Sequence, residues 1–338
     1  MTNVTLKRYN PLSSNFKINT FIAGLSCLLF TFIYVGLLYI SKKTRIGNKN
    51  PGLTKDHPMV IKQRIKVTFI TCAISCISVW TIINISNGFK NDQEEEMNFF
   101  TKIKSTFIIL GLWIPFNSYY LFNILFAPLL LTMILYIGPL YVKFLDQELP
   151  FQKKSSLIHG IKYTFTTLIG FRNLIFAPFT EEFVFRSCMV PLLYYAKVNC
   201  EPIIWMSPLV FAIAHIHHAW EYYINNGRDY NAAKTGILIS IFQFTYTTIF
   251  GWYAAFIFMR TGNFIPTFFV HSFANSQGFP IIYFSEHSQK QQLFICIALV
   301  TGMVGFGKLL FPFTSPRLYG ETTLYWADNN NIIVKDLK

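Results

Sequence analysis

Two adjacent glutamates and an arginine stand in a stretch that is otherwise strongly apolar. Glu182 and Arg186 are four residues apart, so on a helix they share a face and can form an ion pair. Glu181 points about 100° away from Glu182 on such a helix and stays available as a general base. Thr180 is a candidate N-cap, and an ordinary capped helix with one salt bridge is the alternative interpretation.

A second group of candidate residues follows Phe211. His215 closes the apolar face that begins there, and a histidine in such a helix can orient or deprotonate a water molecule. His217 and His218 stand nearer to the polar stretch that begins at Glu221. The alternative interpretation is that all three histidines only pack or form hydrogen bonds.

A third group of candidate residues lies in the uncharged run of residues 261–284. His271 and Asn275 are four residues apart and share one helix face. Both side chains can donate hydrogen bonds, and a rigid pair of donors can stabilise an oxyanion. The alternative interpretation is polar contact between membrane helices, which is common.

Together the three groups offer a base, a water-orienting histidine and two oxyanion donors. That set can hydrolyse an amide by direct attack of water. The sequence contains neither H-E-x-x-H nor G-x-S-x-G, which disfavours a zinc protease and an activated serine. Several Glu and His residues could hold a metal, but standard ligand spacing is missing. We therefore predict a site without metal or other cofactor, and we interpret the six scattered cysteines as packing residues.

The composition indicates a membrane protein. Of the 338 residues, 52% are hydrophobic and 13% are charged, against about 25% charged in soluble globular proteins. The net charge of +13 resides mainly in connecting segments, so we predict no nucleic-acid partner. A disordered, collagen-like or disulfide-framework protein is excluded.

Long apolar runs predict an all-α polytopic membrane protein, in which about eight transmembrane helices enclose a catalytic cavity. A crossing needs about 20 apolar residues, and only helices satisfy the backbone of such a segment in lipid. The uncharged runs are residues 21–40, 67–85, 105–142, 235–259, 261–284 and 291–307. Interrupted apolar pieces follow at residues 163–179, 183–196 and 203–220.

The run 105–142 is too long for one crossing, and Pro115, Asn117 and Ser118 mark a break. It forms either two short spans or one span with an interfacial piece. Residues 41–66 hold eight Lys or Arg and one acid, which predicts a cytosolic loop. We predict N-terminal membrane helices with this loop in residues 1–150, a catalytic core in 151–311 and a polar tail in 312–338.

Three segments in the right order resemble the signatures of the type II CAAX prenyl proteases, the Ras-converting enzymes. This family belongs to a superfamily of CAAX proteases and bacteriocin-processing proteins. The resemblance covers about residues 150–285, whereas residues 1–150 contribute only hydropathy. The matching segments are RNLIFAPFTEEFVFR (172–186), FAIAH (211–215), and FGWYAAFIFMRTG (250–262) followed by HSFAN (271–275).

The resemblance implies an endopeptidase of the endoplasmic reticulum membrane, multi-pass, with an active site accessible from the cytosol. It would remove the last three residues of farnesylated or geranylgeranylated CAAX proteins, such as Ras-type small GTPases. By motif position, Glu181 and His215 would activate water, while His271 and Asn275 would stabilise the oxyanion. Glu182 and Arg186 would support the site. No cofactor is implied.

Two alternatives remain open from the sequence. One is a non-catalytic membrane scaffold or immunity-type protein of the same superfamily, which would keep the motifs for structure. The other is a metal-dependent membrane hydrolase built from the same glutamates and histidines.

Overall fold

The computed structural model describes residues 10–13, 15–40, 54–90, 95–154, 157–278, 286–320 and 324–326. Over these residues the chain is built of helices, and its β-structure is limited to one isolated bridge between Lys90 and Glu96. The predicted all-α polytopic architecture is confirmed.

Six helical segments among the described residues are long and apolar enough to cross a bilayer. The predicted count of about eight is therefore not confirmed. One of these segments, Cys200–Asn225, combines α10 (Cys200–Ile213) and α11 (His217–Asn225) across a short turn. The others are α1 (Thr20–Ile40), α2 (Pro58–Ile85), α4 (Ser118–Leu135), α12 (Tyr230–Thr261) and α14 (Gln289–Phe313).

The long run 105–142 is broken where proline and asparagine predicted a break. The chain leaves α3 (Phe99–Ile109), turns at Gly111 with a φ of +69°, and begins α4 after Asn117. The Asn117 side chain caps α4 by accepting from the Tyr119 N–H. A separate short helix, α5 (Ile137–Leu145), follows, so this run holds one segment of spanning length.

The first motif lies in an almost continuous helix and not at a helix start. α7 (Leu168–Phe171), α8 (Ala177–Glu182) and α9 (Met189–Tyr195) are joined by the π-helical segments η1 (Arg172–Phe176) and η2 (Phe183–Cys188). The prediction that Thr180 caps a helix was therefore wrong. Its hydroxyl donates to the Phe176 carbonyl one turn back, because the helix already extends through this position.

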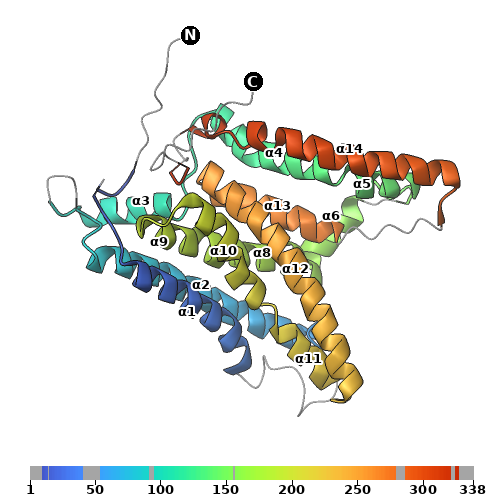
Figure 1. The fold of residues 1–338 in the computed structure, drawn as a ribbon, viewed down its shortest axis with the longest axis horizontal. Helices are drawn as coiled ribbons and strands as arrows, with labels where there is room; N and C mark the ends of the chain where they lie inside the picture. The colour runs from blue at the N-terminus through green and yellow to red at the C-terminus, as the bar shows by residue number, and fades with distance from the viewer. Residues whose placement is uncertain are drawn as a thin grey trace, which may run out of the picture.

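This interrupted helix from α7 to α9, the central helix, occupies the middle of the bundle. Figure 1 shows α8, α9 and α10 at the centre, with α1 and α2 on one side and α12 and α13 (Phe264–Gln277) on the other. α14 packs along α4 and α5, and α13 also contacts α4. α6 (Leu157–Thr166) leads into α7. The motif-bearing segments thus face one another inside a shell of apolar helices.

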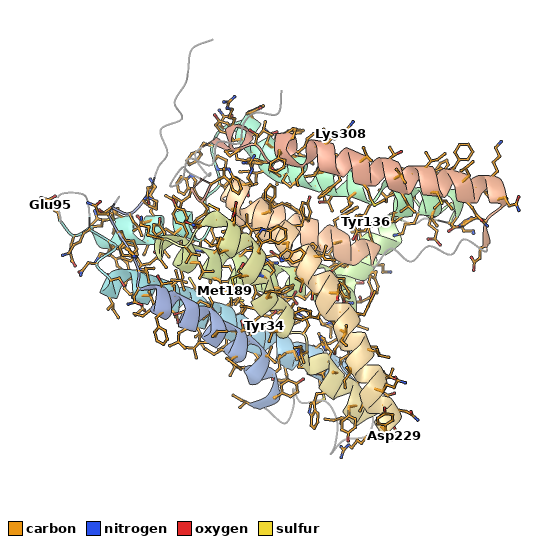
Figure 2. The ribbon with its side chains drawn as sticks, viewed as in Figure 1. Tyr34, Glu95, Tyr136, Met189, Asp229 and Lys308 are labelled. Atoms are coloured by element: carbon orange, nitrogen blue, oxygen red, sulfur yellow. The ribbon has the colours of Figure 1, made fainter. Side chains whose placement is uncertain are left out.

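The outer helices expose apolar side chains, as expected for a surface that faces lipid. On α14 only Ile295 and Gly302 are buried, and its side chains project outwards along the edge of the molecule that carries Lys308 (Figure 2). In water such a surface would be unfavourable, whereas lipid tails accept it.

The basic segment 41–66 is only partly a loop. Residues 41–53 lie outside the described residues, and α2 already begins at Pro58. Lys62, Arg64 and Lys66 consequently belong to the first turns of α2. The predicted divisions at residues 150 and 311 stay predictions, because nothing in the fold tests them.

Gly251 allows α12 to approach α10 closely. A Cβ at this position would lie 2.6 Å from the Pro208 Cβ and 3.4 Å from Arg186 Nη2. We expect Gly251→Ala to destabilise the protein by about 1–3 kcal/mol, because the packed helices have to separate. Thermal unfolding in detergent measures this effect. Gly24→Ala is the matched control, since a Cβ there meets nothing within 4 Å, and equal effects of the two changes would contradict the prediction.

Candidate active site

Glu182 is the buried centre of a polar network between three helices. Its Oε1 accepts from Arg186 Nη1 at 3.0 Å and from His271 Nδ1 at 2.7 Å. The Glu182 and Arg186 side chains are almost fully buried, and the ion pair predicted from their spacing is present. Since a carboxylate only accepts, Nδ1 of His271 donates and Nε2 is left to face the neighbouring carboxylate.

Glu181 has different surroundings. Its Oε2 lies 3.8 Å from His271 Nε2, and its side chain keeps 17% of its exposure because it lines a cavity. His271 therefore stands between the two carboxylates, bound to one and turned towards the other. The Glu182 carboxylate is held by fixed partners, whereas the Glu181 carboxylate is in contact with solvent.

Neighbouring aromatic rings fix this network in place. The Phe250 ring packs on the His271 imidazole with centroids 4.8 Å apart. The Arg186 guanidinium lies over the Phe211 ring at 4.7 Å, and its Nη2 donates to the Gly251 carbonyl at 3.4 Å. The buried Arg186 cation is thus stabilised by the Phe211 ring, the Gly251 carbonyl and the Glu182 carboxylate together.

His215 lines the same cavity as Glu181. It lies in the turn between α10 and α11, and not within an apolar helix as predicted. Its Nδ1 lies 3.0 Å from the Phe211 carbonyl oxygen, which can only accept, so Nδ1 carries the proton. In the neutral ring Nε2 is then an acceptor, which suits a residue that orients water.

The cavity has a volume of about 150 Å³ and is bounded by five parts of the fold. α1 and α2 form one wall, and the central helix and α10–α11 form the others. Its lining residues include Tyr34, Leu38, Ile61, Arg64, Thr68, Arg172, Phe176, Ala177, Thr180, Glu181, Phe185, Phe211, Ala214, His215, His217 and His218.

Asn275 is not brought into this cavity. It is exposed, and its Nδ2 donates to the Asn173 carbonyl at 3.0 Å. Ser272 donates to the Leu174 carbonyl at 2.6 Å, so α13 is tied to η1 by two side-chain bonds. Of the six predicted site residues, the structure brings together Glu181, Glu182, Arg186, His215 and His271, and it leaves Asn275 at their edge.

A second buried carboxylate, Glu221, contacts two residues of the cavity wall, Arg64 and His218. Glu221 Oε1 accepts from Arg64 Nη2 at 2.6 Å and from the Tyr39 hydroxyl at 3.1 Å, while Oε2 lies 3.3 Å from His218 Nδ1. His217, His218 and Glu221 are close enough together to be considered as metal ligands. The Arg64 guanidinium already binds the Glu221 carboxylate. In this arrangement the three residues therefore belong to an ion-pair network.

The family model described as type II CAAX prenyl endopeptidase Rce1-like matches residues 163–277. CAAX prenyl protease 2 of Homo sapiens is 34% identical over 313 residues, covering 88% of this chain and 83% of the relative. This chain belongs to that family. The Arabidopsis thaliana relative is 37% identical over 58% of this chain and 65% of its own length. A probable CAAX prenyl protease 2 of Schizosaccharomyces pombe is 32% identical over 82% and 88%. No solved structure matches.

The match spans every motif on which the resemblance was based, so the resemblance to the type II CAAX prenyl proteases is confirmed. Sequence reasoning missed residues that reach the cavity from outside this range. Tyr34 on α1 turns towards the centre (Figure 2), where its hydroxyl lies 3.0 Å from Thr180 Oγ1. Arg64 comes from α2. Their only sequence signal is a polar group within or beside an apolar run.

Proposed function

We propose that this chain is a glutamate-dependent intramembrane endopeptidase that removes the C-terminal tripeptide from prenylated CAAX proteins. The observation that carries the proposal is the contrast between the two adjacent carboxylates. Glu182 is locked by Arg186 and His271, whereas Glu181 faces a cavity that His215 also lines. The names of the relatives, which are CAAX prenyl proteases, support the same substrate class.

In the proposed reaction, Glu181 accepts a proton from a water molecule that His215 orients through Nε2. The water oxygen attacks the carbonyl carbon of the scissile amide, and a tetrahedral oxyanion forms. His271, once Nε2 as well as Nδ1 carries a proton, donates to this oxyanion, with Asn275 as a second donor if its amide turns from the Asn173 carbonyl. Glu181 then returns the proton to the leaving nitrogen as the C–N bond breaks. Glu182 and Arg186 hold His271 in position.

The position of the cavity supports access from the cytosol. Leu38 at the end of α1 and Ile61 and Arg64 at the start of α2 line it. The connection between these helices carries most of the basic cluster of residues 41–66, and basic segments stay on the cytosolic side. The substrates we propose are farnesylated or geranylgeranylated CAAX proteins such as Ras-type GTPases, in the endoplasmic reticulum membrane. A prenyl chain gains about 0.8 kcal/mol per buried CH₂, which favours a site between lipid-facing helices.

The test uses purified protein in detergent with a fluorogenic farnesylated CAAX peptide and its unprenylated counterpart, with a chelator present throughout. We expect chelator-resistant cleavage of the prenylated peptide and loss of cleavage in His271→Ala. Absence of cleavage by well-folded wild type would favour a non-catalytic scaffold. Chelator-sensitive cleavage would favour a metal-dependent hydrolase, with His217, His218 and Glu221 as its ligands.

A further inference from the structure

We propose that Arg172 binds the C-terminal carboxylate of the peptide substrate and so sets the distance from that carboxylate to the bond attacked at Glu181. The inference rests on the proposed function, because a CAAX peptide ends in a free carboxylate. Arg172 and Glu181 both line the cavity. A bound peptide would therefore meet a cation near its end and the general base near its scissile bond.

Arg172 is held by contacts that a substrate carboxylate can share or replace. Nη2 donates to Asp56 Oδ1 at 2.8 Å, and the Asp56 side chain is 44% exposed. Nη1 donates to the Lys55 carbonyl and Nε to Asn173 Oδ1, both at 2.9 Å. Within the described residues these bonds use three of the five guanidinium N–H groups. Exposed ion pairs are weak, so Asp56 is an exchangeable partner.

The other arginine of the cavity is committed elsewhere. Arg64 lies 2.6 Å from Glu221, whose side chain is 8% exposed and which also accepts from Tyr39. Separating this buried pair would leave an uncompensated charge, which is strongly unfavourable. Of the two guanidinium groups on the cavity wall, Arg172 is therefore the one that can accept a new carboxylate.

The π-helical segment η1 turns Arg172 to the side of Glu181. Nine steps of a regular α-helix rotate a side chain by about 900°, which would put these two residues on opposite faces. A π turn contains one extra residue, so the rotation corresponds to about eight regular steps and the two side chains fall on neighbouring faces. Phe176, Ala177 and Thr180 line the cavity between them.

The spacing along this face fits a tripeptide. The nine steps from Arg172 to Glu181 rise about as far as eight regular helical steps because of the π turn, which separates the two Cα atoms by roughly 12 Å. Three extended residues reach about 10 Å from the scissile carbonyl to the terminal carboxylate, and the two side chains bridge the remainder. One added residue would displace the carboxylate by about 3.5 Å. The arrangement thus selects both a free carboxylate and a length of three residues.

The experiment compares three farnesylated peptides: one with a free C-terminal carboxylate, its carboxamide, and a form one residue longer. For wild type we expect the carboxamide to lower kcat/KM by about 10- to 100-fold, the range of a charge-assisted bond. The longer peptide should also be cleaved less well. In Arg172→Ala all three should be cleaved at similar, low kcat/KM, and Arg172→Lys should be intermediate, because it keeps the charge without the guanidinium fork.

Two variants separate substrate binding from a purely structural role. Asp56→Ala removes the partner and keeps the cation, so the preference for the carboxylate should persist or increase. Arg317→Ala removes an exposed arginine beyond α14 and should behave like wild type. If Asp56→Ala abolishes the preference as Arg172→Ala does, the ion pair is structural and the proposal fails.

Binding of a non-hydrolysable peptide, in which a ketomethylene group replaces the scissile amide, gives a readout that does not need catalysis. We expect the Kd for the carboxylate form to rise about 10-fold or more in Arg172→Ala, with little change for the carboxamide. Equal cleavage and binding of carboxylate and carboxamide by wild type would overturn the role of Arg172 and leave the proposed function standing. Carboxylate-selective, Arg172-dependent binding without any cleavage would support the site and overturn the proposed function.

Discussion

Glu181→Gln is expected to lower kcat by about 10²–10⁴-fold, because the amide cannot take the proton that the water must lose. The substitution keeps the size of the side chain, and Glu181 is not a partner in the buried ion pair, so the protein should remain folded. Initial rates with a farnesylated peptide, together with thermal unfolding, measure the two effects separately.

The matched control is Glu201→Gln, which neutralises an exposed glutamate in the first turn of α10. It should cleave the peptide at the wild-type rate. A Glu181→Gln enzyme that keeps a rate within a few-fold of wild type would remove Glu181 from the mechanism.

Glu182→Leu should have the largest effect on stability, a loss of about 3–5 kcal/mol. It leaves the Arg186 guanidinium buried without its carboxylate, and an uncompensated buried charge is costly. The free energy of unfolding in mixed detergent measures this loss. Combining Glu182→Leu with Arg186→Met should restore part of the stability without restoring activity, because an apolar pair of similar volume avoids the buried charge.

Asp56→Asn is the matched control for this loss, since the Arg172–Asp56 pair is exposed and should contribute about 0–1 kcal/mol. Equal destabilisation by Glu182→Leu and Asp56→Asn would show that the buried network does not hold the core together.

Contacts along one helix were predictable from the sequence, and contacts between helices were not. Helical periodicity alone pairs Glu182 with Arg186, because that distance is set within one turn. The bond from His271 to Glu182 joins residues 89 positions apart, and it depends on how α13 packs against the central helix. The ion pairs of Arg64 with Glu221 and of Arg172 with Asp56 likewise join distant parts of the sequence and depend on how those parts pack.

The bundle architecture followed from hydropathy, but its local irregularities did not. Apolar runs predicted α1, α2, α12 and α14 because lipid requires long helices. The π turns on both sides of Glu181 and Glu182 leave no mark in hydropathy, and the acids after Thr180 resembled a helix start. The resemblance to a known family identified the site residues through their motifs. The orientation of their side chains became visible only from the packing of the helices.

The π turns also bear on how this gene can change. A codon lost from the stretch that encodes Arg172–Phe176 could be absorbed by relaxing η1 to a regular helix, so the bundle would survive. The residues before the gap would keep their orientation relative to Glu181 and Glu182, because a regular helix that is one residue shorter rotates as far as the π-helical segment does. An inserted residue would instead rotate the preceding part of the helix by about 100° relative to both glutamates. Single-residue deletions here should therefore yield well-expressed proteins that keep activity, whereas insertions should be absent from functional descendants of this segment.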